Sequence, residues 1–137
     1  MVSELIQVKF SKIMQTRAYT MVIVGTDEKR FPIYTEPAVG QLLQGTLTGV
    51  EHRRPLTHDL ISEIFLGMGV RIKQIVINDL QGSIYFARLF IEQEIDDKRH
   101  ILEVDARPSD CITLALLHDV PVYCTRPVFD AAIPVQE

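Results

Sequence analysis

The character of the chain changes at one short stretch, Val104-Asp105-Ala106-Arg107-Pro108-Ser109-Asp110. Residues 101–104 before it are mostly apolar and strand-like, and residues 111–117 after it place apolar side chains at helical spacing. Pro108 suits the first turn of a helix, because its ring presets φ and its missing N–H has no intrahelical partner there. The stretch therefore predicts a strand that leads into a helix from Pro108 to about Leu117.

The same junction gathers charged and hydroxyl side chains at the start of a helix, where outward-pointing N–H groups favour anions. Two interpretations stay open at this point. In the first, the side chains form a functional site. In the second, Asp110 offsets the helix dipole, Ser109 caps the helix, and Asp105 pairs only with Arg107.

Strand and helix patterns outside this stretch predict one α+β domain. Residues 18–34 form a hairpin that turns at 26–29, and Thr57 begins a helix as its N-cap, with Asp59 in the first turn. A first helix is expected to start at 35–37 and to end near 46, and the second helix is expected to end near 68. Strands are expected at 5–10, 70–77, 83–91, 101–104 and 120–124. The connecting segments are a hairpin loop at 78–82 and a charged turn at 92–100, with a bulge near 73–74. Together they predict a single compact domain over 1–137, with a mainly antiparallel mixed sheet and about three helices.

Composition narrows the classes of function. The chain has 137 residues, 47% hydrophobic and 23% charged, which is ordinary for a globular domain with a sizeable core. No apolar run approaches the ~20 residues of a membrane span, and no basic-then-apolar start marks a signal peptide, so we expect a cytoplasmic protein without a membrane partner. A net charge of −4 argues against a broad basic surface for nucleic acid but leaves room for a small local site. Cys111 and Cys124 are too few for a disulfide framework and are expected as reduced core residues.

A second polar cluster precedes another apolar helix, in Arg54-Pro55-Leu56-Thr57-His58-Asp59-Leu60. His58 and Asp59 have the chemistry for acid–base work or metal binding, since His titrates near neutrality and carboxylates bind hard cations. The alternative is that Thr57 and Asp59 cap the helix while His58 is solvated.

Arg88 is unusual because both faces of its strand, residues 84–91, are apolar. We expect such a strand to be covered on both sides, where a guanidinium is costly unless it is paired. Its partner is then Asp105, Glu103 or Asp59, or else Arg88 binds an anion.

Three segments in order, residues 54–60, Tyr85-Phe86-Ala87-Arg88-Leu89 and residues 104–110, make the chain resemble the bifunctional nuclease domain family over roughly residues 5–130. The resemblance implies a compact α+β fold, frequent homo-oligomers (a dimer or trimer), and members that degrade both RNA and DNA. Many members carry Glu-Ala on the first helix, where this chain has Val39-Gly40. Any role of that glutamate in relatives is therefore missing here.

Two functions follow from these residues. The first is a nuclease that hydrolyses RNA or DNA with the help of a divalent metal ion. Its candidate bases and ligands are Asp105, Asp110, His58 and Asp59, with Asp105 and Asp110 as metal ligands and Arg88, Arg107 and Ser109 binding the substrate phosphate. The second is a non-catalytic, oligomeric binding or regulatory module in which the Asp and Arg residues are structural. The two differ in whether these side chains converge on an open cleft.

Overall fold

Seven strands and four helices make up the part of the chain that the computed structural model describes, residues 4–135. In chain order they are β1 (Leu5–Gln15), β2 (Thr20–Gly25), β3 (Arg30–Thr35), α1 (Pro37–Leu47), α2 (Thr57–Gly67), β4 (Val70–Gln81), β5 (Ile84–Ile95), β6 (Lys98–Ala106), α3 (Pro108–His118), β7 (Val122–Thr125) and α4 (Arg126–Ala131). Within that part, no helix has the length and apolar character needed to cross a membrane. The domain expected over 1–137 also includes residues 1–3 and 136–137, which lie outside the described part.

All seven strands belong to one sheet, in the spatial order β3-β2-β1-β7-β4-β5-β6. Neighbouring strands run antiparallel, except that β4 and β7 pair in parallel. The parallel pair arises because the chain leaves β6, forms α3 and returns between β1 and β4. The predicted α+β fold with a mainly antiparallel mixed sheet is confirmed.

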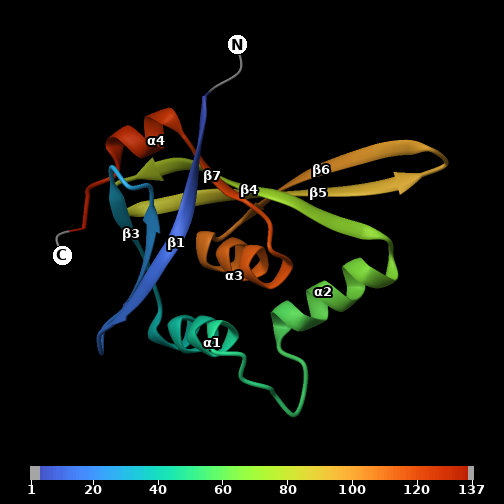
Figure 1. The fold of residues 1–137 in the computed structure, drawn as a ribbon, viewed down its shortest axis with the longest axis horizontal. Helices are drawn as coiled ribbons and strands as arrows, with labels where there is room; N and C mark the ends of the chain where they lie inside the picture. Colours follow the sequence, from blue (N-terminus) through green and yellow to red (C-terminus); the bar gives the residue numbers. More distant parts are fainter. Residues whose placement is uncertain (1–3, 136–137) are drawn as a thin grey trace.

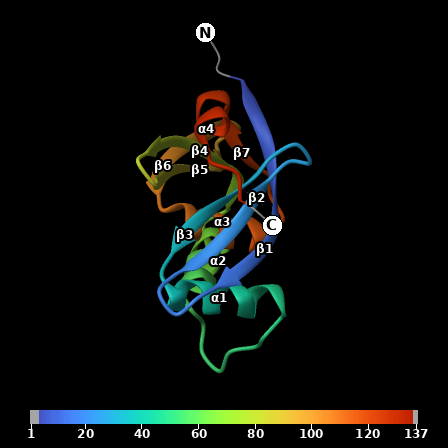
Figure 2. The same ribbon diagram turned by 90° about the vertical axis from the view of Figure 1, so that its left-hand side faces the viewer.

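Helix α3 lies at the centre of the core. It contacts β3, β4, β5, α1 and α2. In Figure 1 the helices α1, α2 and α3 lie on one side of the strands, and Figure 2 shows β2 and β3 passing in front of α3. A helix surrounded in this way must be apolar around most of its circumference. The buried residues of α3 are Ser109, Cys111, Ile112, Thr113, Leu114 and Ala115.

Two hairpins are tighter than the sequence indicates. Strands β4 and β5 continue through the expected loop at 78–82 and pair as far as Gln81 and Ile84. Strands β5 and β6 occupy the segment 92–100 that we expected as a charged turn, and the chain reverses at Asp96-Asp97. Both aspartates have positive φ, 52° and 62°, as a type I′ turn requires, and Asp tolerates this because its short side chain bonds locally. The predicted bulge near 73–74 is confirmed.

Helix starts also differ in detail from the prediction. The N-cap of α2 is Leu56 and not Thr57, which is already helical. The cap is instead closed by Asp59, whose Oδ2 accepts a hydrogen bond from the Leu56 N–H at 2.9 Å. Helix α4 was not predicted; Thr125 Oγ1 accepts from the Val128 N–H at its first turn. Both starts use a side-chain oxygen to satisfy an amide that has no helical partner.

Helix α1 packs closely on β2 at Gly40, one of the two positions at which many members of the family that the chain resembles are expected to carry Glu-Ala. A Cβ atom on Gly40 would overlap the side chain of Thr20, which is fully buried. The amide of Gln15 donates to both Thr20 Oγ1, at 3.3 Å, and the Pro37 carbonyl, at 3.0 Å. Gly40 is therefore needed for the close approach that fixes the start of α1.

Candidate active site at the contact of α2 and α3

Asp110 lies in the first turn of α3, three residues after the N-cap residue Arg107. Pro108 holds Arg107 in an extended conformation (φ −68°, ψ 142°), because a residue before proline avoids the helical region. Arg107 then reaches forward to Asp110. Its Nε donates to Oδ2 at 2.9 Å and its Nη2 donates to Oδ1 at 3.3 Å.

His58, on the first turn of α2, completes the cluster from the other side. Its Nε2 lies 3.1 Å from Oδ1 of Asp110. The side chains of His58 and Asp110 are 15% and 30% exposed, so the contact is largely shielded and solvent reaches only part of it. Two of the three polar segments in the sequence, 52 residues apart at this point, thus meet side chain to side chain. We call Arg107, Asp110 and His58 the Arg–Asp–His cluster.

Within this cluster the negative charge of Asp110 lies beside the positive charge of Arg107. Burial alone raises the pKa of the Asp110 carboxyl, but the hydrogen bond and charge of Arg107, together with His58, outweigh burial and leave that pKa below its usual range. The bond to Asp110 in turn raises the pKa of the Arg107 guanidinium. Asp110 is therefore an ionised acceptor at neutral pH.

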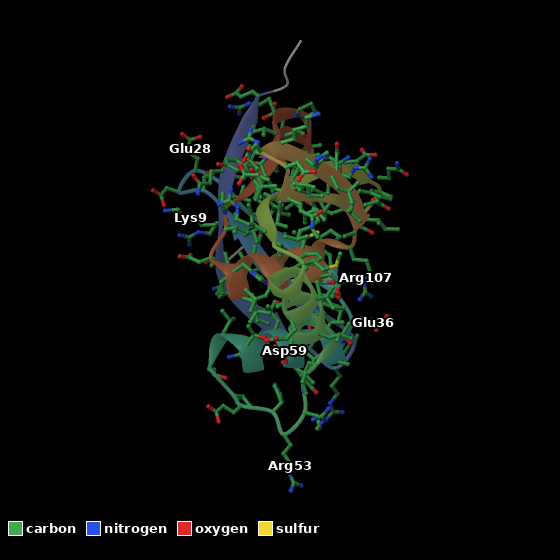
Figure 3. The ribbon with its side chains drawn as sticks, turned by 90° about the vertical axis from the view of Figure 1, so that its right-hand side faces the viewer. Lys9, Glu28, Glu36, Arg53, Asp59 and Arg107 are labelled. Carbon is green, nitrogen blue, oxygen red and sulfur yellow. The ribbon has the colours of Figure 1, made fainter. Side chains whose placement is uncertain are left out.

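Two pockets border the cluster. One, of about 200 Å³, is lined by His58, Asp59 and Thr113 together with residues of α1 and of the segment 49–56. The other, of about 290 Å³, is lined by Arg107, Ser109 and Tyr34 among others. Figure 3 shows Arg107 on the same side of the molecule as Glu36, and Asp59 closer to the middle of the view. The cluster thus has open space beside its histidine and beside its arginine.

Ser62 and His118 extend the cluster, and neither was a candidate in the sequence. Ser62 Oγ donates to the carbonyl of His58 at 2.9 Å and lies 2.8 Å from Nε2 of His118. The available signal was the spacing of four between His58 and Ser62, which places both on one face of a helix. His118, at the far end of α3, is brought in only by packing of the two helices.

Asp105 and Arg88 form a separate pair on β5 and β6. They are directly opposite each other in the sheet, with Arg88 Nη1 at 3.9 Å from Asp105 Oδ1 and Arg88 Nε at 3.1 Å from Glu103 Oε1. Within residues 4–135, Asp105 makes no hydrogen bond or ion pair with the Arg–Asp–His cluster. The expectation that this strand is covered on both sides is wrong, since the Arg88 side chain is 36% exposed. On its other side Arg88 is opposite Val76 of β4, and an arginine stem can pack along such an apolar neighbour while its guanidinium stays in solvent.

The remaining predicted site residues, Asp59 and Ser109, lie in the first turns of α2 and α3. Asp59 closes the N-cap of α2, and Ser109 is buried in the first turn of α3. Within residues 4–135, the Asp110 carboxylate instead has His58 and Arg107 as its hydrogen-bond partners. Among the described residues, no three His, Cys, Asp or Glu side chains are grouped so as to hold a metal ion. Asp105 and Asp110, the predicted ligand pair, contact different arginines, Arg88 and Arg107. The two cysteines are free and buried, as predicted.

Comparisons with known proteins agree with the family resemblance that the three polar segments indicate. The family model described as the bifunctional nuclease domain matches residues 21–136. The chain belongs to the bifunctional nuclease domain family. It is similar to an uncharacterized protein of Mycobacterium tuberculosis, 33% identical over 105 residues, covering 77% of this chain and 60% of that protein. It is also similar to bifunctional nuclease 2 of Arabidopsis thaliana, 28% identical over 95 residues (69% of this chain, 29% of that protein), and to bifunctional nuclease 2 of Oryza sativa subsp. japonica, 28% identical over 109 residues (80% and 33%).

This bifunctional nuclease domain therefore spans about a third of the named plant nucleases and under two thirds of the mycobacterial protein. What the domain acts on by itself is a matter of proposal.

Proposed function

We propose that the Arg–Asp–His cluster hydrolyses phosphodiester bonds of RNA or DNA, with His58 moving the proton and Arg107 contacting the phosphate. The observation that carries this proposal is the 3.1 Å contact between His58 Nε2 and Asp110 Oδ1, with Arg107 on the same carboxylate. It joins two segments by which the chain resembles a nuclease family, and it supplies a positioned histidine.

The ionised carboxylate sets the tautomer of His58. Because Asp110 can only accept a hydrogen bond, the proton between them belongs to Nε2 of His58. The lone pair of the neutral ring then lies on Nδ1. An aspartate that orients a histidine in this way is the arrangement found around a general base.

The proposed step uses water as the nucleophile. His58 Nδ1 takes a proton from water as the water oxygen bonds to phosphorus, and the bond from phosphorus to the leaving oxygen breaks. The leaving oxygen takes its proton from the imidazolium of His58 or from solvent. Because water attacks, the 2′-hydroxyl of RNA is not needed, and the same residues serve RNA and DNA.

Arg107 has donors to spare for the phosphate. Its Nε and one Nη2 hydrogen are used on Asp110, and a guanidinium has five N–H donors. It also lines the pocket of about 290 Å³ that Tyr34 borders. The ring of Tyr34 is half-exposed, and an exposed aromatic ring next to a phosphate contact is the arrangement on which an unpaired base stacks. We therefore propose single-stranded nucleic acid as the preferred substrate.

The test is a cleavage assay of labelled single-stranded RNA and DNA by the purified wild type and by His58→Gln. We expect the variant to lose activity by about 100-fold or more, the size of a general-base contribution. His100→Gln is the matched control, since His100 is exposed on β6 and outside the cluster. Equal activity of His58→Gln and wild type would contradict the proposal.

The same assay separates the competing accounts. Run with a chelator and with added Mg²⁺ or Mn²⁺, it shows any metal requirement, and we expect the ratio of wild type to His58→Gln to be the same in both. Melting temperatures of all variants are recorded beside the rates. A wild type without cleavage activity, together with a lower melting temperature of His58→Gln, would instead mark the cluster as a structural tie between α2 and α3.

A further inference from the structure

The sheet has two edge strands, β3 and β6, and they differ in protection. Strand β3 contains Pro32, which has no N–H to donate, and the carbonyl of Arg30 already accepts from the Val135 N–H at 2.9 Å. Strand β6 has nine residues and no proline, and in Figure 1 the β5–β6 hairpin projects beyond the helices. The outer N–H and C=O groups of such an edge are a template for another strand.

The charges of β6 are divided between its two halves. Lys98, Arg99 and His100 form a basic first half, and Glu103 and Asp105 make the second half acidic. The apolar Ile101 and Leu102 lie between them, and Leu102 is 57% exposed. A second identical strand laid parallel in register would place like charges side by side, whereas an antiparallel one places opposite charges side by side.

We propose that β6 pairs antiparallel with β6 of a second copy of this chain, forming a two-fold dimer in which the sheet continues across the interface. Centred on Leu102, the pairing sets Leu102 of the two copies opposite each other and Arg99 opposite Asp105 of the second copy. Every contact then occurs twice, as an isologous interface requires.

The side chains involved have capacity for these contacts. Arg99 Nε lies 3.3 Å from Glu92 Oε1, and its terminal Nη groups remain available. The Asp105 side chain is 71% exposed, and within residues 4–135 its ion pair is the long 3.9 Å contact to Arg88. Alternation along β6 puts Arg99 and Asp105 on the same outer face. Charges on an edge also deter aggregation, but their separation into a basic and an acidic half additionally selects one orientation of the partner.

The first test introduces a thiol at the proposed two-fold axis. Directly opposite residues in an antiparallel pair have Cα atoms about 4.5–5.5 Å apart, within the range that a disulfide spans. We expect Leu102→Cys to form a covalent dimer on mild oxidation, or Ile101→Cys to do so if the register is shifted by one residue in each strand. The two native cysteines are not expected to crosslink, because burial raises the pKa of the Cys111 thiol to about 12 and that of the Cys124 thiol to about 11.

The matched control is Ile133→Cys, at a side chain that is 77% exposed and lies after α4. We expect it to remain monomeric on a denaturing, non-reducing gel under the same oxidation. Crosslinking at position 133 as efficient as at 101 and 102, or no crosslinking at either β6 position, would overturn the proposed interface.

The second test reverses charges and measures the mass of the protein in solution by sedimentation velocity. We expect a dimer for the wild type, a lower dimer fraction for Arg99→Glu and for Asp105→Arg, and recovery in the double variant. Melting temperatures show that each variant is folded. A wild type that is monomeric at all concentrations, a trimer, or single variants that dimerise like wild type would each overturn the proposal.

Discussion

Asp105 and Asp110 belong to one stretch of seven residues, yet the structure gives them different surroundings. Asp105 is the penultimate residue of β6, and its exposed carboxylate lies beside Arg88 on the neighbouring strand. Asp110 is in the first turn of α3, where its shielded carboxylate accepts from Arg107 and meets His58 of α2. The same residue type, five positions apart, is thus a solvated surface charge in one place and the centre of a charge network in the other.

The change of backbone period at Pro108 produces this difference. Along β6 the side chains alternate between the two faces of the sheet, so Asp105 shares a face with its cross-strand partner Arg88. From Pro108 onward the side chains advance by about 100° per residue, which turns Asp110 toward α2. Proximity in sequence across a strand-to-helix junction is therefore a poor guide to proximity in space.

The largest expected difference between the two aspartates is in catalysis. On the proposed function, Asp110→Asn loses about 100-fold in cleavage rate, because an amide can donate to His58 and favour the wrong tautomer. Asp105→Asn, which leaves the Arg–Asp–His cluster intact, stays within about twofold of wild type. Rates on single-stranded RNA under single-turnover conditions measure both. Equal losses in the two variants would show that the whole segment, and not the cluster, carries the activity.

The second difference is in folding stability. Asp110→Ala removes hydrogen bonds to a charged group at a partly buried site, and we expect it to lower the free energy of unfolding by about 1–2 kcal/mol. For Asp105→Ala, an exposed partner in a long ion pair, the expected loss is under about 0.5 kcal/mol. Urea denaturation of both variants and wild type provides the measurement. A larger loss for Asp105→Ala would mean that the outer face of the sheet is an energetic centre of the fold.

The sequence was informative wherever a local rule decides the structure. The helix beginning at Pro108, the bulge near 73–74 and the role of Asp59 at a helix start all follow from proline geometry, apolar phase and capping. The tight turn at Asp96-Asp97 was missed, because two acidic residues in a charged run resemble a loop more than a type I′ turn. Helix α4 was missed because it is only six residues long.

The site was predicted only in its parts. His58, Asp110 and Arg107 were all candidates, but their meeting depends on how α2 packs on α3, and no local pattern specifies that. Arg88 was expected to be buried because apolar residues line both faces of β5, but its side chain is 36% exposed. Both outcomes come from tertiary packing, which single-sequence periodicity does not contain.

A third prediction concerns pH. The pKa of Asp110 is lower in the folded protein than in the unfolded chain, so its contribution to stability is fully present above the unfolded pKa, about 4. That contribution is lost as pH falls from about 4 through the folded pKa. The difference in stability between wild type and Asp110→Asn, up to about 1 kcal/mol, should therefore shrink as the pH falls from about 5 to about 3. Melting temperatures measured across that range test this, and a difference that grows toward low pH would reverse the assigned direction.

The smallest expected effect is that of Arg88→Ala. A guanidinium covered on both sides would cost about 3–5 kcal/mol to remove, since its carboxylate partners would be left buried and unpaired. Because Arg88 and its partners Glu103 and Asp105 are all partly or largely exposed, we expect under about 1 kcal/mol, and less still at high salt. Chemical denaturation at low and high ionic strength measures the loss of stability and its dependence on salt. A loss near 3 kcal/mol that salt does not reduce would show that Arg88 holds a buried ion pair. Asp105 and Asp110 would then both stabilise the fold through an arginine, and the contrast between them would disappear.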